Sequence, residues 1–427
     1  MELRFPDTLQ LGVASAATQI EGGDRNNSWY DWFRQGNIKD GSDPSVANMH
    51  YERYREDAQL MHDMGIRYYR LGLEWARLEP SPGAFDPEAF AHYRDELTLL
   101  RSLGIRPLLT LHHFTNPLWF ERRGAFERAD SVDIFLRFVG KVVEELGDLV
   151  EEYITINEPN VYAVFGWFMG DWPPGKKSVL KTFRVMNHLC ECHIRAYALI
   201  HRMREAKGLS GTKVSYAHHM RVFEPRDMGS LWHRVCTVLM RRIFQNCYSK
   251  TFLTNRACWP LRRVFGVGKG LFCDFHAVNY YSRSAVSGFN EAFFPSVPVS
   301  DLGWEIYPEG IAQCAKELIA LVKLPIYITE NGTCDNTDAF RSRYIAEHLK
   351  VLAESGLPVE RYYHWCFTDN FEWVEGFSAR FGIVHVDYAT QQRTVKRSGN
   401  FYSKMIEARG VTQAMWDEYC DVEYNVK

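Results

Sequence analysis

The chain has 427 residues, a formal net charge of −3, 46% hydrophobic residues and 24% charged residues. This balance is ordinary for a globular protein with a large core, so it excludes a disordered chain. The small net charge gives no field that would gather nucleic acid or an anionic membrane, and we expect neither as a partner.

Aromatic content is the unusual feature of the composition. Aromatic residues make up 14% of the chain, which holds 12 Trp. Flat apolar faces of this kind are what sugar rings stack on, but an aromatic-rich core accounts for the same composition. Composition alone therefore leaves both interpretations open.

Targeting and cofactor signals are weak throughout the sequence. The start Met-Glu-Leu-Arg-Phe-Pro lacks a basic stretch that leads into an apolar run, and no window approaches the roughly 18 apolar residues of a membrane span. Ten cysteines lie between Cys190 and Cys420, and none has the CxxC spacing of zinc or redox sites. We expect reduced thiols, a cytoplasmic protein, and no metal or other cofactor.

A strand followed by an amphipathic helix recurs along the chain. The clearest units run from residues 107–113 into a helix that begins near Asp130, and from 325–330 into a helix over 340–352. No linker or low-complexity tract divides residues 1–427, which we expect to form one catalytic domain. Eight such strands predict an α/β fold, a single (β/α)8 TIM barrel with extended βα loops. The candidate strands lie near 10–19, 67–75, 106–113, 152–157, 213–219, 275–282, 325–330 and 362–368.

Polar residues stand at or near the C-terminal end of these predicted strands. In a barrel of this type, that end carries the active site, so residues distant in sequence would converge there. The competing interpretation is that polar residues merely begin the loops, but loops favour Gly, Asn, Asp and Ser over His, Gln and Glu. The residues are Gln19, Arg70, His113, Asn157, Glu158, His219, Asn279, Tyr281 and Glu330.

Two of these residues are glutamates with the chemistry for glycoside hydrolysis. Cleavage with retention needs two carboxyl groups about 5–5.5 Å apart, one as nucleophile and one as acid and base. Glu158 and Glu330, at the ends of the fourth and seventh predicted strands, could face each other across the barrel mouth. Any long chain contains pairs of Glu, so the surrounding sequence has to decide.

The segments around both glutamates carry a resemblance. Glu158 lies in Thr155-Ile-Asn-Glu-Pro159, and Glu330 lies in Ile328-Thr-Glu-Asn-Gly332. In this order the two segments resemble the signatures of glycoside hydrolase family 1, the β-glucosidase and β-galactosidase family. Further similar segments run from Phe5-Pro6 to Arg380-Phe-Gly382, which is essentially the whole chain. The resemblance implies a retaining exo-β-glycosidase for unphosphorylated β-glucosides, with β-galactosides or β-fucosides as side substrates.

Carried over position by position, the resemblance implies a role for each candidate residue. Glu158 would be the general acid/base and Glu330 the nucleophile that forms a covalent glycosyl-enzyme. Arg70, Tyr281 and Asn279 would support the nucleophile, since a neighbouring cation or hydroxyl donor keeps a carboxylate ionised. Trp304 would line the outer, aglycone side. The substrate-binding residues would be Gln19, His113, Asn157, Trp365, Glu372, Trp373 and Phe381.

The remaining histidines have simpler interpretations. Neighbouring residues of a strand point to opposite sides, so only one of His112 and His113 can face the barrel axis, and the resemblance selects His113. For His218, His219 and His276 we expect buried structural roles. Metal binding by these residues is not expected, because HxxxH and HExxH arrangements are missing from the sequence.

Departures from the resemblance bear on substrate choice. Phe114 stands where many relatives have Trp, which removes one indole donor to the sugar. Relatives that cleave 6-phosphoglycosides have Ser, Lys and Tyr where this chain has Glu372, Ala379 and Phe381, so a phosphate would meet a carboxylate and no cation. Two alternatives to a hydrolase stay open: a catalytically silent sugar-binding relative, which typically lacks one carboxylate, and a transglycosylase with the same residues.

Overall fold

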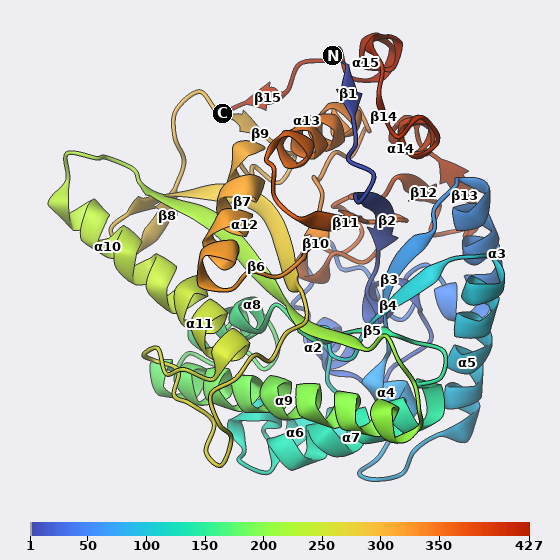
Figure 1. Cartoon of the computed structure of the whole chain (residues 1–427), viewed down its shortest axis with the longest axis vertical. Helices are drawn as coiled ribbons and strands as arrows, with labels where there is room; N and C mark the ends of the chain where they lie inside the picture. The colour runs from blue at the N-terminus through green and yellow to red at the C-terminus, as the bar shows by residue number, and fades with distance from the viewer. Residues whose placement is uncertain (1) are drawn as a thin grey trace.

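A closed barrel of eight parallel strands forms the centre of the computed structural model, which describes residues 2–427 (Figure 1). The strands pair in the order β10-β11-β2-β3-β4-β5-β6-β7, and β7 pairs with β10 to close the ring. This arrangement confirms the predicted (β/α)8 TIM barrel. The barrel strands are β2 (Gln10–Ala14), β3 (Tyr68–Gly72), β4 (Arg106–Thr110), β5 (Glu152–Asn157), β6 (Lys213–Pro225), β7 (His276–Ser287), β10 (Ile326–Asn331) and β11 (Val359–Trp365).

Each barrel strand lies within or overlaps one of the eight predicted segments, with differences at the ends. β2 stops at Ala14, and Gln19 lies in a short helix after it rather than on the strand. Strands β6 and β7 continue past the barrel rim, where Val222 to Pro225 pair with Arg283 to Val286. β7 then turns back into the short antiparallel strand β8 (Asn290–Ala292).

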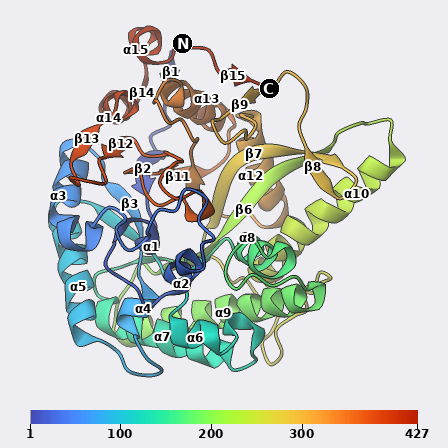
Figure 2. The same ribbon diagram turned by 180° about the vertical axis from the view of Figure 1, so that it is seen from behind.

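Helices follow the strands around the barrel (Figures 1 and 2). The predicted helix near Asp130 is α7, and the one predicted over 340–352 is α13. The α-helices are α1 (Ala17–Ile20), α2 (Ser28–Arg34), α3 (His50–Asp63), α4 (Trp75–Leu78), α5 (Pro87–Ser102), α6 (Leu118–Arg122), α7 (Ser131–Leu146), α8 (Pro159–Ala163), α9 (Val179–Ala206), α10 (Leu231–Arg241), α11 (Cys247–Thr254), α12 (Glu309–Leu321), α13 (Arg341–Glu354), α14 (Arg397–Ala408) and α15 (Gln413–Tyr419).

Short elements complete the fold outside the barrel. β1 pairs with β14 near the two ends of the chain, β12 with β13, and β15 with β9. Within residues 2–427, no helix is both long and apolar enough to span a bilayer. The short elements are β1 (Leu3–Arg4), β9 (Pro298–Val299), β12 (Val384–Val386), β13 (Arg393–Val395), β14 (Gly410–Val411), β15 (Asn425–Val426), the 3₁₀-helices η1 (Ala125–Glu127) and η4 (Trp373–Glu375), and the π-helices η2 (Val164–Met169) and η3 (Arg242–Asn246).

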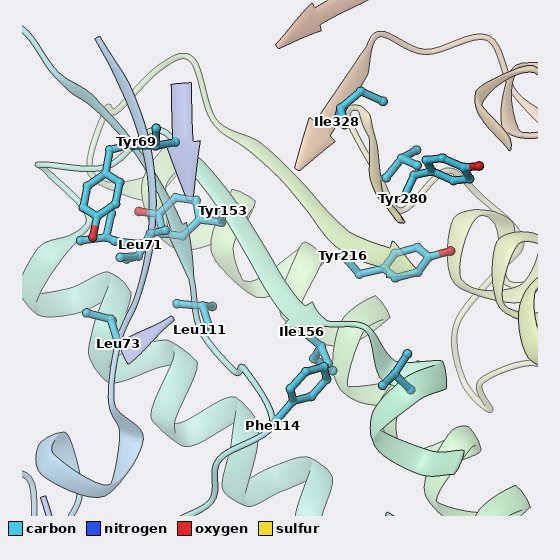
Figure 3. Close-up of a cluster of buried hydrophobic side chains, with 14 of the residues drawn as sticks. Tyr69, Leu71, Leu73, Leu111, Phe114, Tyr153, Ile156, Tyr216, Tyr280 and Ile328 are labelled. Atoms are coloured by element: carbon cyan, nitrogen blue, oxygen red, sulfur yellow. The ribbon is translucent and has the colours of Figure 1, made fainter. Parts of the chain in front are cut away.

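The main core fills the space between the barrel and its helices. Figure 3 shows part of it, where Leu71 and Leu73 of the β3 region lie near Leu111. Helix α7 contributes an unbroken buried face, with Phe138 stacked on Trp75 at a ring separation of 4.7 Å. This packing holds α7 and the turn after β3 together, and therefore positions the loops above the barrel.

We predict that Phe138→Ala lowers the free energy of unfolding by about 3–5 kcal/mol, because the residue is fully buried and the cavity cannot close completely. Urea denaturation followed by tryptophan fluorescence measures the loss. Leu321→Ala is the matched control, since Leu321 is 49% exposed and its truncation should change stability by no more than about 0.5 kcal/mol. Equal losses in both variants would contradict the role of this stack.

Candidate active site

The predicted site residues gather at the carboxyl ends of the barrel strands. The short helices α1, α2 and α8, which follow β2 and β5, lie over this end in Figure 2. Arg70 comes from β3, Asn157 from β5, Asn279 and Tyr281 from β7, and Glu330 from β10. Glu158 follows β5 directly. All six side chains are buried, which places ionisable groups where water cannot screen them.

Glu330 receives two strong hydrogen bonds. The guanidinium of Arg70 forms an ion pair with one carboxylate oxygen, and the Tyr281 hydroxyl donates to the other at 2.6 Å. Arg70 is 0% exposed and Tyr281 lies below the surface, so both donors are fixed by packing. Donors of this kind stabilise a carboxylate in its charged form.

Glu158 is held by an amide and an imidazole. The Asn279 side-chain amide donates to its Oε1 at 2.8 Å, and His219 Nδ1 lies 3.0 Å from the same oxygen. The sequence predicts a buried, hydrogen-bonded histidine at this position, and the structure gives Glu158 as its partner. His218 and His276 instead contact side chains and a carbonyl away from the glutamates, as structural histidines do.

A chain of hydrogen bonds connects the two glutamates. Arg70 donates from one nitrogen to Glu330 and from the other to Asn157 Oδ1 at 2.6 Å. Asn279 donates to the same Oδ1 at 3.0 Å and also to Glu158. Thr329, beside Glu330, donates to Asn279 Oδ1 at 2.7 Å. The positions of the two carboxyl groups are therefore set by one shared network.

His113 lies between two tryptophans beside this network. Its ring stacks on Trp365 and on Trp373 with centroid separations of 5.8 and 5.7 Å. The Asn157 amide donates to His113 Nε2 at 2.9 Å, so Nδ1 carries the hydrogen. Burial lowers the pKa of His113 well below its ordinary value, with the Arg70 charge acting in the same direction. The ring is therefore neutral and has one N–H to offer a ligand.

Gln19 and Glu372 form a second polar pair on the same side. Gln19 Nε2 donates to the Phe371 carbonyl at 2.8 Å and to Glu372 at 3.3 Å. Burial, the largest cause, and the nearby charge of Glu330 together raise the pKa of Glu372 to about 8, against hydrogen bonds from Gln19 and Trp365 that lower it. Glu372 therefore sits close enough to Glu330 to feel its charge.

An aromatic wall closes the side of the site next to Glu330. Tyr281 meets Trp304 edge-to-face at 5.7 Å, and Phe381 lies 5.9 Å from Trp304. Phe381 is buried, whereas Trp304 is 38% exposed and reaches toward the surface. The wall therefore runs from the buried carboxylates outward to solvent.

Opposing influences act on the ionisation of Glu330. Burial is the largest and raises the pKa of Glu330 to about 7, with the Glu158 charge in the same direction, while Arg70 and Tyr281 lower it. Glu330 therefore has two donors, the Arg70 guanidinium and the Tyr281 phenol, that favour its charged form against the effect of burial.

The backbone at Glu158 is strained. Its φ is +41°, in the left-handed region that side chains other than Gly rarely adopt, and it precedes Pro159 at the start of α8. Such a conformation costs on the order of 1–3 kcal/mol. The Glu158 N–H donates to the Ala217 carbonyl at 2.8 Å, which holds the residue in place. Strain of this kind is common where a side chain must be aimed at a reacting atom.

A cavity of about 260 Å³ lies at the opposite end of the barrel. It is lined by residues before and at the start of β4 and β5, including Arg106 and Glu151, which form an ion pair at 3.0 Å. In barrels of this type the active site lies at the other end, where the carboxyl ends of the strands meet. None of the predicted site residues lines this cavity. We therefore place no substrate there.

Comparison with known families agrees with the two glutamate segments. The sequence model of "Glycosyl hydrolase family 1" matches residues 1–249 and 274–411. The chain belongs to this family. Family membership makes it a glycoside hydrolase of the β-glucosidase type, and residues 250–273 are the internal stretch that the family 1 model does not match.

Relatives in family 1 cover nearly the whole chain. Beta-glucosidase A from Thermotoga maritima is 30% identical over 96% of this chain and 99% of its own length. A beta-galactosidase from Pyrococcus woesei is 26% identical, with 97% and 99% coverage. Among solved structures, a beta-glycosidase from Pyrococcus horikoshii superposes with a TM-score of 0.86 at 32% identity over 98% of both chains. The Thermotoga maritima beta-glucosidase in complex with glucoimidazole gives 0.87 at 28% identity, with 96% and 100% coverage.

We predict that Tyr281→Phe moves the acidic limb of the kcat/KM profile to higher pH by about 1–2 units. Loss of a donor to the charged form raises the pKa of Glu330, and a hydrogen bond to a charged group is worth about 1.5–3 kcal/mol. The profile is measured with nitrophenyl β-glucoside.

Tyr363→Phe is the control for this experiment. Tyr363 is also buried, but its hydroxyl has no hydrogen-bond partner among residues 2–427, so the profile should stay in place. An acidic limb that shifts to lower pH in Tyr281→Phe, or equally in both variants, would show that the phenol does not control Glu330.

Proposed function

We propose that this family 1 enzyme is a retaining exo-β-glycosidase that hydrolyses unphosphorylated β-glucosides through a covalent glycosyl-enzyme. The observation that supports this most is the network from Glu330 through Arg70, Asn157 and Asn279 to Glu158. It gives Glu330 a guanidinium and a phenol as partners and Glu158 an amide and an imidazole, an asymmetry that suits a nucleophile and an acid/base.

The first half-reaction breaks the glycosidic bond. The Glu330 carboxylate attacks the anomeric carbon from the α face, while Glu158 transfers its proton to the leaving oxygen. The aglycone departs as an alcohol, the sugar is joined to Glu330 in the α configuration, and Glu158 is left as a carboxylate. Charge on Glu330 is lost in this step, and Arg70 and Tyr281 then hydrogen-bond the ester oxygens.

The second half-reaction releases the sugar. Glu158, now a base, takes a proton from a water molecule, whose oxygen attacks the anomeric carbon. The bond to Glu330 breaks, Glu330 leaves as a carboxylate stabilised again by Arg70, and Glu158 is reprotonated. Two inversions give a β sugar, so the configuration is retained. Glu158 makes both proton transfers in this scheme, and the proposed mechanism needs no metal.

Recognition of the sugar would use the buried groups beside the glutamates. Gln19 Oε1 and His113 Nδ1 are buried and have no hydrogen-bond partner within the described residues 2–427. Buried polar groups are nearly always paired, so these atoms are suited to sugar hydroxyls. Trp365 would provide the platform for the ring, Trp373 and Asn157 further donors, and Trp304 the aglycone side.

The acceptance of glucosides is supported by relatives and by the polar pair. Thermotoga maritima beta-glucosidase, the structural neighbour, is described in complexes with glucoimidazole and with deoxynojirimycin. Gln19 and Glu372 together could each bind two neighbouring hydroxyls in a bidentate way, which discriminates between hydroxyl configurations.

We predict strong discrimination against 6-phosphoglucosides. At the positions where phosphate-binding relatives have Lys and Tyr, Ala379 and Phe381 are buried apolar residues, and Glu372 would repel a phosphate. Comparing kcat/KM for nitrophenyl β-glucoside and for its 6-phosphate measures this. A preference for the phosphorylated substrate would overturn the proposed substrate class.

The catalytic roles predict opposite products from two variants supplied with azide. Glu330→Gly should lose activity by about 10³-fold or more, and azide should convert a β-glycosyl fluoride into the α-glycosyl azide by one inversion. Glu158→Ala should still form the glycosyl-enzyme from substrates with good leaving groups, and azide should release it as the β-glycosyl azide. Product configuration is read by NMR.

Glu375→Ala is the matched control, because Glu375 lies in the η4 region near the site but pairs with Lys39 at the surface. Its activity should be unchanged, with or without azide. The β product from Glu330→Gly together with the α product from Glu158→Ala would mean that the two roles are exchanged. Activity like that of the unmodified enzyme in either variant would place the reaction elsewhere.

A further inference from the structure

Helix α10 presents its apolar face to solvent. Its large hydrophobic residues recur at spacings of three and four, which puts them on one side of the helix, yet this side is exposed. Surface helices of globular proteins normally turn such a stripe inward. The stripe consists of Leu231 (70% exposed), Trp232 (56%), Val235 (42%), Val238 (65%) and Leu239 (37%), and Met228 (70%) lies in the turn before the helix.

The opposite side of α10 is packed against the barrel extension. Cys236 is buried in a small cluster with Phe223 of β6 and Val286 of β7. The Thr237 hydroxyl donates to the His233 carbonyl at 2.8 Å, inside the helix. The stripe therefore faces outward because the helix is fixed by its other side, and α10 projects from the body of the molecule in Figures 1 and 2.

Positive charge is concentrated in the segment that contains α10. Residues 226–273 hold nine Lys and Arg and a single acidic residue, Asp227, for a net charge of +8. The rest of the chain therefore carries −11 of the total of −3. Eight of the nine basic side chains belong to exposed residues, and Arg241 is half-buried and paired with Glu317. The exposed residues are Arg226, Arg234, Arg242, Lys250, Arg256, Arg262, Arg263 and Lys269.

The same segment includes further exposed aromatic side chains. Trp259 is 61% and Phe265 is 86% exposed, and both lie within residues 250–273, which the family 1 model does not match. Trp232 of α10 meets Phe289, which is 62% exposed, at a ring separation of 5.6 Å. This part of the chain thus combines basic side chains with exposed aromatic ones, and residues 250–273 of it lie outside the family 1 match.

We propose that α10 docks the enzyme on the surface of an anionic phospholipid bilayer. Leu231, Trp232 and Val238 would enter the boundary between headgroups and acyl chains, while the arginines would bind lipid phosphates. An amphipathic helix with apolar bulk and adjoining basic residues binds anionic bilayers in this way, and each component alone binds weakly. The rest of the chain is acidic, so the net charge of the whole chain does not reveal the positive charge of residues 226–273. For this reason the composition predicts no membrane partner.

Charge favours a bilayer over a second copy of the chain as the occupant of this face. A two-fold dimer formed through α10 would bring two segments of net charge +8 together, and like charges at an interface oppose association. An anionic bilayer instead complements the segment and accepts the exposed Trp and Leu side chains. Because α10 follows β6 at the carboxyl end of the barrel, docking would bring the barrel mouth near the membrane surface.

Co-sedimentation with lipid vesicles tests the proposal on the full-length enzyme. We expect binding to vesicles of phosphatidylcholine and phosphatidylglycerol in equal parts at low salt, and much weaker binding to phosphatidylcholine alone. Raising the salt to 0.5 M should weaken binding, because it screens the arginines. Failure to sediment with the anionic vesicles at low salt would overturn the proposal.

Two pairs of variants locate the contact. Leu231→Asp with Val238→Asp should reduce the partition coefficient by about tenfold or more, and Arg234→Gln with Arg242→Gln should reduce it and its salt dependence. The matched controls, Leu321→Asp on exposed Leu321 of α12 and Arg202→Gln on exposed Arg202 of α9, should bind normally. Activity on nitrophenyl β-glucoside should be unchanged in all four, which shows that they are folded.

The remaining outcomes contradict the proposal. Normal vesicle binding by the Leu231→Asp and Val238→Asp double variant would mean that another surface holds the membrane. Sedimentation velocity tests the alternative occupant of this face, a second copy of the chain. A dimer that the same double variant dissociates, in a protein that does not bind anionic vesicles, would show that α10 is a contact between copies of the chain.

Discussion

The guanidinium of Arg70 is the interaction on which the active site depends. It is completely buried, and an unpaired cation in that position would be strongly destabilising. Its donors are instead used on Glu330, Asn157, Thr110 and the Thr329 carbonyl. Only the planar fork of Arg can serve partners on three other strands at once, so Lys could not replace it. Strands β3, β4, β5 and β10 are thereby held in one arrangement around the reacting carbon.

The surroundings of Arg70 contain more acid than base. Glu158 and Glu330 are buried and Glu372 is half-buried, and burial raises the pKa of both Glu330 and Glu372. A second cation would favour the charged forms of Glu330 and Glu372, whose pKa values burial raises. The excess of acid and the strained backbone of Glu158 are therefore costs to stability that the large core on the outside of the barrel offsets.

Much of the fold could be predicted from sequence because the signals are local. Each barrel strand is a short apolar run, and α7 shows its buried face through the spacing of Val132, Phe135, Val139, Val142 and Leu146. The sequence predicts Gln19 at the end of the first strand, whereas it lies in α1, because the alanine and β-branched residues near it do not mark where β2 ends and α1 begins. Strand ends are set by pairing with neighbours, which a single segment does not contain.

The site was less uniformly predictable. Glu158 and Glu330 carry recognisable surrounding segments, whereas His219 stands beside His218 with nothing in the sequence to say which faces the barrel axis. Its partner, Glu158, is 61 residues away in the sequence. The contact depends on which alternate residues of β6 point toward the barrel axis. The outward face of α10 was also missed, because its helical spacing is the same as that of a buried face. Exposure depends on what the rest of the chain packs against, and α10 packs on two long strands that leave the barrel.

The pairing of β1 with β14 has a consequence for the connectivity of the ring. Leu3 lies opposite Val411, and β1 and β15 lie at the same end of the molecule along its longest axis (Figures 1 and 2). The order of the eight strands around the barrel is cyclic, since β11 pairs with β2 as any strand pairs with its neighbour. A short peptide that joins the two ends would turn the chain into a closed loop, and the loop could be opened between other units, for example at the exposed turn around Gly208. The closed ring of eight strands therefore does not require the chain to begin at any particular strand.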